Sequence, residues 1–359
     1  MKFKYLLLAA AMFTCTTSAM AQNDTDSEVA ALKERVAELE TKEQNSSKFK
    51  AFADKHLNLS GYLQAGVQWT ENADPSTTFY IRRARVSLSG NFLKEKFDYR
   101  LQVDMAGSPK ICDLYIRYKP LNALNVQLGQ FKLPFSLENE LYGPTKFEFI
   151  EYSYLTTYIT RNNAKYDGIS ATGRDMGLQL YGGFIQKDGF SIINYNVGVF
   201  NGSGINNKDN NSSKDVIARL IIKPIKGLTI SGSYMYAETK FGDDNYMKSP
   251  RWSVGAIYDV RHWIARSEFA QANFGGNTTN AFYALAGYHF ERPWSVVARY
   301  EFINDELDVL NEDRITLGAI YKPFKFLRLQ LNLSYTMNDI APEAYRNTMG
   351  ANLMVSAIF

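Results

Sequence analysis

The side chains best suited to chemistry in this chain are arginines that alternate with apolar residues. Arg83 and Arg85, for example, alternate with Ala84 and Val86. A β-strand turns successive side chains to opposite faces, so such arginines lie on the polar face of an amphipathic strand. A guanidinium stays charged at any relevant pH and offers forked donors to carboxylate or phosphate oxygens. The pattern therefore predicts a polar wall that can guide or bind anions.

The same alternation sorts further arginines onto polar faces. The full set is Arg83, Arg85, Arg100, Arg219, Arg266, Arg299, Arg314 and Arg328. Acidic residues such as Glu268 and Glu301 are interleaved with them. Each arginine is therefore expected either to form an ion pair within the wall or to contact a solute.

The sequence gives little support for a catalytic site. His56, His262 and His289 stand before the first predicted strand, in a predicted turn and near a strand end. None has a Ser or Cys partner at a suggestive spacing, and the sequence has neither a metal-ligand cluster nor a phosphate-cradling loop. We expect no cofactor. The enzyme alternative is a barrel-embedded lipid hydrolase, which would need a histidine and a serine adjacent on the outer wall.

The charge balance gives no support for a nucleic-acid partner. Removing Lys2 and Lys4, which belong to a predicted signal peptide, from the 40 basic residues leaves 38 against 37 acidic ones. Any preference for anions must therefore come from local placement. Only Cys112 remains in the mature chain, so no intramolecular disulfide can form.

Amphipathic strands are the elements that must position these side chains. In 327–335, Leu and Tyr at odd positions oppose Arg, Gln, Asn and Ser at even ones. This alternation continues over about 300 residues, more amphipathic sheet than a two-layer soluble core needs. It predicts an all-β fold, an antiparallel transmembrane β-barrel of about 16 strands, apolar towards lipid and polar towards a water-filled lumen. A soluble glycan-binding sandwich would have fewer strands, and it would have no alternating set of apolar side chains that faces lipid.

The predicted strands are separated alternately by short turns and by longer polar loops. They cover 57–69, 78–90, 97–105, 110–119, 124–132, 174–183, 189–199, 215–223, 228–237, 251–259, 263–273, 280–290, 294–303, 313–322, 326–336 and 347–359. Longer polar loops include 200–214, 238–250 and 337–346. Short periplasmic turns and longer outer loops are typical of outer-membrane barrels.

Both ends of the chain carry export signals. Residues 1–21 have two lysines, an apolar stretch over 5–13, and small residues that lead to Ala19-Met20-Ala21, which predicts a cleaved signal peptide. Together with the barrel pattern, this predicts the outer membrane of a Gram-negative bacterium. Cys15 offers a lipoprotein alternative, but Phe13 and Thr14 do not match the pattern before a lipidated cysteine. At the other end, Phe359 closes an outward apolar series, a signal expected to engage the barrel assembly machinery.

A short helical segment is predicted over residues 22–44, ahead of the barrel at 57–359. Val29, Leu32, Val36 and Leu39 follow a 3-4-3 spacing among charged residues. This is the seam of a coiled coil, over about two heptads. Two interpretations stay open, a solvated tether and a short trimeric coiled coil. Residues 45–56 are predicted to be a linker.

One connection, 133–173, is too long for a simple loop and is rich in Phe, Tyr and Glu. A structureless segment of this length is unusual in a compact domain. We expect it to fold into the lumen and set the constriction. The alternative is an outer cap or a subunit contact.

Several stretches resemble a known family when they are taken together and in order. They are 79–86, 97–104, 114–120, 129–138, 174–177, 195–202 and 297–301. Across roughly residues 57–359 the chain resembles the phosphate-selective porin O and P family. The resemblance implies a homotrimer of barrels, each with a channel that an inserted third outer loop narrows.

In phosphate-selective members, inward arginines lead to a lysine cluster at the constriction. On matching positions the resemblance implies Arg83 and Arg85 as wall arginines and Lys132 as a constriction cation. The loop departs from the family pattern, because its cations Lys146, Arg161 and Lys165 are accompanied by four glutamates.

We therefore expect an outer-membrane porin, embedded in the lipid bilayer, for passive diffusion of small hydrophilic solutes, with anions or phosphate as the preferred class. The alternative is a saccharide or general channel, in which inward aromatics such as Tyr115, Phe131 and Tyr181 form a slide.

Overall fold

The computed structural model describes residues 22–93, 95–161, 172–209, 211–241, 245–291 and 293–359. The predicted signal peptide lies outside the described residues. The chain divides into two units after Lys55. No helix in the described part is both long and apolar enough to cross a membrane.

Helix α1 (Gln22–His56) runs without interruption through the segment that we predicted to be a linker, residues 45–56. The helix contains neither Pro nor Gly and is rich in Ala, Lys and Glu, which are favourable helix formers. Its polarity misled the prediction, because a helix that stands in solvent needs no continuous apolar stripe.

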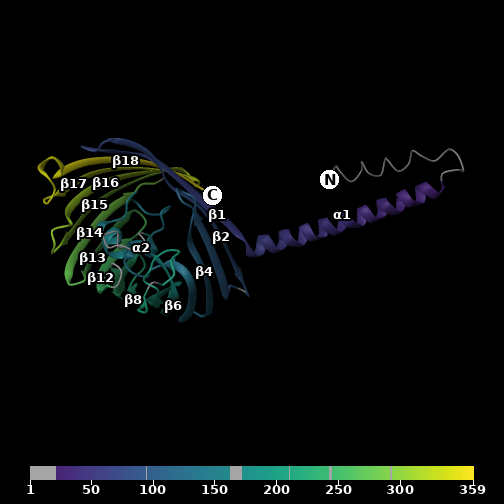
Figure 1. Cartoon of the computed structure of the whole chain (residues 1–359), viewed down its shortest axis with the longest axis horizontal. Coiled ribbons are helices and arrows are strands. Elements are labelled where there is room, and N and C mark those ends of the chain that lie inside the picture. The colour runs from purple at the N-terminus through teal and green to yellow at the C-terminus, as the bar shows by residue number, and fades with distance from the viewer. Residues whose placement is uncertain (1–21, 94, 162–171, 210, 242–244, 292) are drawn as a thin grey trace. The chain divides into compact units, whose positions relative to one another are not determined.

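The second unit is a closed antiparallel barrel in which β1 pairs with β18 (Figure 1). This confirms the predicted 16-stranded fold, and the strand bounds agree closely with the sequence pattern. The barrel strands are β1 (Asn58–Thr70), β2 (Thr77–Phe92), β3 (Phe97–Asp104), β4 (Lys110–Leu121), β5 (Leu124–Lys132), β6 (Arg174–Lys187), β7 (Phe190–Phe200), β8 (Asp215–Ile222), β9 (Leu228–Tyr236), β12 (Arg251–Asp259), β13 (Trp263–Phe274), β14 (Asn277–His289), β15 (Trp294–Asp305), β16 (Asn311–Phe324), β17 (Leu327–Asn338) and β18 (Asn347–Ile358).

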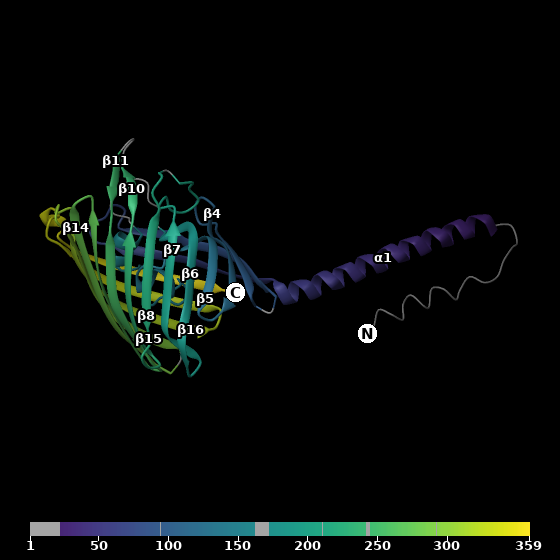
Figure 2. The same ribbon diagram turned by 90° about the horizontal axis from the view of Figure 1, so that it is seen from below.

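Five short elements lie in the described parts of the connections. The hairpin of β10 (Glu238–Phe241) and β11 (Asn245–Lys248) extends beyond the barrel rim (Figure 2). We had expected only a polar loop over 238–250, because strands this short carry no useful alternation. The others are α2 (Leu137–Leu141), the π-helix η1 (Leu155–Thr160) and the 3-10 helix η2 (Glu343–Tyr345).

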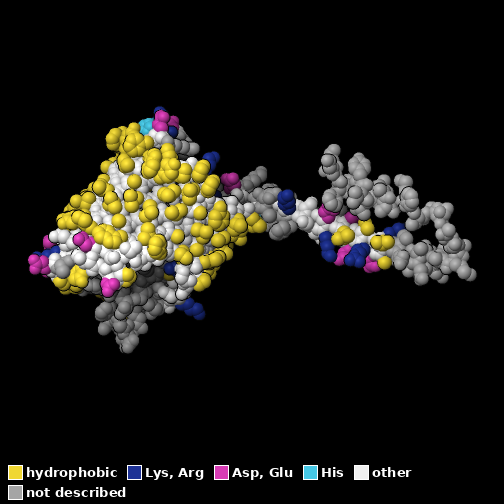
Figure 3. Space-filling model, turned by 90° about the horizontal axis from the view of Figure 1, so that it is seen from above, with side chains coloured by type: hydrophobic (Ala, Val, Ile, Leu, Met, Phe, Trp, Pro, Cys, Tyr) yellow, Lys and Arg dark blue, Asp and Glu magenta, His cyan; other side chains and the backbone are white. Residues whose placement is uncertain are grey.

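Side chains follow the predicted parity. In β17, Leu331 and Leu333 are exposed on the outer wall, whereas Arg328 and Gln330 are buried inside. Hydrophobic side chains cover the barrel face seen in Figure 3. The terminal Phe359 is exposed, and its backbone pairs with Gly61 at 2.9 and 3.0 Å. The wall thus has the apolar exterior that a bilayer requires.

Gly129 occupies a backbone conformation in β5 that favours glycine. Its φ is +130°, and an added Cβ would lie 2.2 Å from the Leu114 carbonyl oxygen of β4. We predict that Gly129→Ala destabilises the barrel by about 1 kcal/mol or more. The check is the temperature at which the compact folded band disappears in SDS gels.

The matched control is Gly232→Ala in β9, where the nearest atom to an added Cβ lies at 4.0 Å and φ is not positive. Equal melting temperatures for the two variants would contradict the strain assigned to Gly129.

Candidate functional site

The connection between β5 and β6 enters the barrel and is bonded to its inner wall. Leu137 N donates to both carboxylate oxygens of Glu268 on β13, each at 3.0 Å. Ile150 N donates to Asn332 Oδ1 on β17 at 2.8 Å, and Tyr154 N to a Glu301 oxygen on β15 at 2.7 Å. Residues 133–161 of this connection are described, and they fill part of the lumen. We call this segment the inserted loop.

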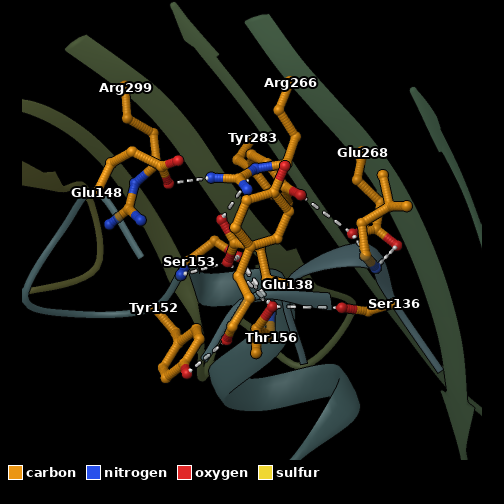
Figure 4. Close-up of polar contacts among 12 residues, drawn as sticks. Ser136, Glu138, Glu148, Tyr152, Ser153, Thr156, Arg266, Glu268, Tyr283 and Arg299 are labelled. Carbon is orange, nitrogen blue, oxygen red and sulfur yellow. Dashed lines mark hydrogen bonds and ion pairs between the residues drawn. The ribbon is translucent and has the colours of Figure 1, made fainter. Parts of the chain in front are cut away.

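Two buried glutamates hold the loop near α2. Glu268 accepts the first N–H of this short helix, from Leu137, and a hydrogen bond from Tyr283 at 3.2 Å. Glu138 accepts from Ser153 Oγ at 2.6 Å and from Thr156 Oγ1 at 3.1 Å (Figure 4). The carboxylates therefore satisfy N–H and O–H groups that would otherwise be buried without partners.

Arg266 is the cation at the centre of this network. Its guanidinium donates to Glu148 at 2.6 Å, lies 3.9 Å from Glu138 and sits 3.6 Å from the centre of the Tyr142 ring. Figure 4 shows Arg266 between the glutamates of the loop. Its side chain is fully buried, so it serves the loop and not the solute.

Three other predicted arginines also bind the loop. Arg299 donates to the Glu151 carbonyl at 3.1 Å, Arg328 to the Thr145 carbonyl at 2.9 Å, and Arg219 to the Glu140 carboxylate. The sequence left two roles open for these arginines, a partner within the protein or a solute. For Arg219, Arg266, Arg299 and Arg328 the structure favours the partner within the protein, and that partner includes the inserted loop. All four side chains point inwards as predicted, but their N–H groups donate to oxygen atoms of the loop.

An apolar core lies between the loop and one side of the wall. The loop contributes Phe135, Phe147, Phe149, Leu155 and Ile159. On the wall, β5, β7, β8, β9 and β15 contribute some residues, and β13 and β14 contribute Ile264, Ala270, Ala272, Phe274, Ala281, Tyr283 and Leu285. We did not predict this core, because we assigned every outward side chain to lipid and every inward side chain to water. The available signal was that β13 has apolar residues on both of its faces.

Open space remains on the opposite side, between β1–β6 and the loop. A cavity of about 360 Å³ lies there, and we call it the cation pocket. Its charged lining comprises the cations Arg85, Arg100, Arg117, Lys132, Lys146 and Arg174 and the acids Asp113 and Glu140. Six positive groups thus face two negative ones. The structure brings together three predicted wall cations, Arg85, Arg100 and Lys132, with Lys146 of the loop and with two cations that the prediction omitted.

Asp113 organises the part of the pocket nearest the loop. It accepts from Arg174 Nε at 2.7 Å and lies 3.5 Å from Arg100 Nε. Lys132 on β5 and Arg174 on β6 are cross-strand neighbours. A carboxylate of the chain itself is therefore held between two guanidinium groups.

The remaining wall arginines have local partners. Arg85 donates to Asp104 at 2.7 Å and to Tyr62 Oη at 3.1 Å, and Arg83 donates to Gln64 at 2.9 Å. Arg117 pairs with Asp98 at 2.6 Å. The expected wall ion pairs are thus present, and they hold the guanidinium groups in fixed positions.

Arg314 belongs to a second cavity, of about 250 Å³, which it lines together with Glu151, Arg299 and several Asn and Thr residues. Its Nε donates to Glu301 at 2.7 Å. This cavity carries a more balanced set of charges than the cation pocket.

A β-bulge brings one further arginine inside. Gln64 pairs with Arg83 but Ala65 pairs with Ile81, so Arg82 is an extra residue in β2. Arg82 forms a forked ion pair with Glu151 of the inserted loop. Strict alternation cannot indicate this position, because a bulge shifts parity by one residue.

The aromatic residues proposed for a saccharide slide are not assembled in one place. Tyr115 and Phe131 line the cation pocket with ring centres 6.2 Å apart. Tyr181 lines a different cavity, together with Asn122 and Gln186. Two rings in one pocket do not form a continuous track.

Catalytic and metal-binding arrangements find no support in the described part of the chain. No group of His, Cys, Asp and Glu there could hold a metal ion. His289 Nδ1 lies 2.9 Å from Ser295 Oγ, but Ser295 shares the inward parity of Val297 and Arg299. A lipid hydrolase would need this pair on the outer wall.

Tyr152 lies in the inserted loop among positive charges. Burial alone would raise the pKa of its phenol, but Lys132, Arg161 and Arg83 outweigh burial and lower the pKa to about 8. The Arg161 guanidinium is 3.9 Å from the ring centre. The phenol therefore ionises close to physiological pH and then cancels one positive charge beside the cation pocket.

We predict that any anion preference of the channel weakens as the pH rises through about 8, and that Tyr152→Phe reduces this change. The sign follows from the lowered pKa, since the phenol is neutral below it and negative above it. Zero-current potentials in a salt gradient at successive pH values provide the check. A Tyr152→Phe profile identical to that of the native channel would contradict the assignment.

A closed barrel with an apolar exterior, a polar lumen and an inserted loop defines a porin-type channel. The chain belongs to the phosphate-selective porin O and P family, whose model matches residues 57–262. This confirms the family that the sequence resembles. No curated protein sequence matches the chain. The family identifies a diffusion channel in the outer membrane of a Gram-negative bacterium, as predicted.

Solved structures are similar in fold. An anion-selective porin from Comamonas acidovorans has a TM-score of 0.70 at 17% identity, covering 84% of this chain and 99% of that one. A trimer form of OmpT, an outer membrane protein of Vibrio cholerae, gives 0.62 at 11% identity with coverages of 84% and 99%. The outer membrane channel DcaP of Acinetobacter baumannii gives 0.62 at 14% identity, with coverages of 84% and 97%.

Proposed function

We propose that this porin conducts anions in preference to cations and that they pass through the cation pocket. The observation that carries the proposal is the lining of that pocket, six cationic side chains against two acids. Fixed positive charge in a narrow aqueous path raises the local concentration of anions and lowers that of cations.

The residues have distinct parts in this proposal. Arg100 is partly exposed, with a side-chain exposure of 39%, and its long 3.5 Å approach to Asp113 leaves donors available to a solute. Arg85, Lys132 and Arg174 supply positive potential from more sheltered positions. Arg219, Arg266, Arg299 and Arg328 keep the inserted loop in place, which narrows the path beside the pocket.

We also propose a homotrimer, assembled in the outer membrane. The trimer form of the OmpT structure supports this, since its fold is similar. The exposed terminal Phe359 on the outer wall supports recognition by the barrel assembly machinery.

The proposal is tested by titrating phosphate against chloride current in planar bilayers. A binding site for oxyanions predicts a saturable loss of chloride current, because a bound phosphate obstructs the path. Glucose at matched concentrations is the neutral control. No phosphate block, or an equal loss with glucose, would overturn the anion site.

A further inference from the structure

Helix α1 presents apolar side chains that no described residue of its own unit covers. Leu32, Val36 and Leu39 are 62, 51 and 59% exposed. Their spacing of four and three residues places them on one face of the helix, at positions d, a and d of a heptad. The helix is 35 residues long and carries this stripe only in its first half.

Charged residues flank the stripe in a complementary pattern. With Val36 at position a, Arg35 is at g and Glu40 at e. In parallel helices in register, a g residue of one helix lies against the e residue five positions later in its neighbour. Arg35 therefore meets Glu40 of a second copy, with opposite charges.

We propose that α1 docks on α1 of other copies of this chain, in a short parallel coiled coil with Leu32, Val36 and Leu39 at its centre. The occupant of the apolar stripe is a second copy, because the flanking charges complement themselves. The parallel direction follows from barrels inserted in one membrane with the same orientation. This inference rests on the proposed trimer and extends it to a second contact between subunits.

The coiled coil depends on the barrels for its stability. About two heptads are too few to associate alone in water. Tethering to associated barrels makes pairing intramolecular, at effective concentrations in the millimolar range. The seam then adds stability to an assembly that the barrels have already formed.

Cysteine cross-linking in the full-length protein tests the contact. Val36→Cys is made together with Cys112→Ser, which removes the buried native thiol. Position a faces its own counterpart in a parallel in-register coiled coil, so mild oxidation should give a cross-linked dimer band. Glu34→Cys, at position f on the outer face, is the matched control and should give none. Equal cross-linking at both positions, or none at Val36→Cys, overturns the inference.

A charge exchange adds a readout of the flanking pairs. Arg35→Glu should lower the cross-linked fraction of Val36→Cys several-fold, because the new carboxylate lies against Glu40 of the neighbouring helix. Adding Glu40→Arg should restore the cross-linked fraction. An unchanged fraction in both variants contradicts the pairing.

The mass of the detergent-solubilised protein, measured by light scattering, separates failure of the inference from failure of the trimer. A trimer without Val36→Cys cross-linking refutes the coiled coil alone. A monomer without cross-linking refutes the trimer and the coiled coil together.

Discussion

Replacing Arg266 with methionine is expected to raise single-channel conductance and weaken ion preference, because the inserted loop loses its central anchor. Arg266 is fully buried and holds Glu148 at 2.6 Å and Glu138 at 3.9 Å. Without it, both carboxylates stay buried without their cation. Removing one partner of a buried pair costs about 3–5 kcal/mol, enough to displace the segment from the wall. Conductance in planar bilayers is the measurement.

Arg261→Met is the matched control for this change. Arg261 pairs with Glu291 at 3.3 Å, and both side chains are largely exposed, so conductance should not change. The folded gel band and far-UV circular dichroism establish that each variant keeps its barrel. An intact barrel with native conductance in Arg266→Met would contradict the anchoring role.

The largest change in ion preference is expected from Lys132→Glu. Lys132 lines the cation pocket beside Arg174, and the substitution alters the local charge by two units. One unit charge about 6 Å from a passing ion is worth roughly 3 kcal/mol at an effective dielectric constant of about 20. Even with screening, the anion-to-cation permeability ratio should fall by on the order of tenfold.

Two further variants bracket this result. Lys132→Gln keeps a hydrogen-bond donor for the Asn139 carbonyl and should give about half of the free-energy shift, since it removes one charge. Lys187→Glu reverses a charge at an exposed site that does not line the cation pocket and should have little effect. A native permeability ratio in Lys132→Glu would remove this lysine from the conduction path.

The barrel could be predicted from sequence because lipid imposes one rule on every strand. Each backbone group must be paired within the sheet, and each outward side chain must be apolar. The pattern in 327–335 obeys this rule, and β17 forms there as expected. The same rule places Arg266 and Arg328 inside, which the structure bears out.

The sequence could not predict in the same way which inward arginines bind the inserted loop and which line the cation pocket. Parity fixes the face of a side chain but not whether water or the inserted loop lies against it. Arg100 faces the pocket, whereas Arg266 faces Glu148 of a segment more than a hundred residues away. Such contacts depend on how the loop folds, and the loop has no repeating pattern.

Local irregularities hid two other cations. Arg82 enters the lumen through a bulge, and Arg174 faces the pocket although it shares the parity of the outward Met176 and Leu178. Arg174 lies at the first residue of β6, where the inserted loop rejoins the wall. Arg117 alternates regularly with Ile116 and Tyr118, so the sequence did indicate its inward position.

The zero-current potential of the native channel in a potassium chloride gradient tests most directly the claim that this porin conducts anions in preference to cations. The structure predicts a zero-current potential near the equilibrium potential of chloride, which has the sign of an anion-selective pore. A potential of the opposite sign, showing that potassium carries most of the current, would contradict it.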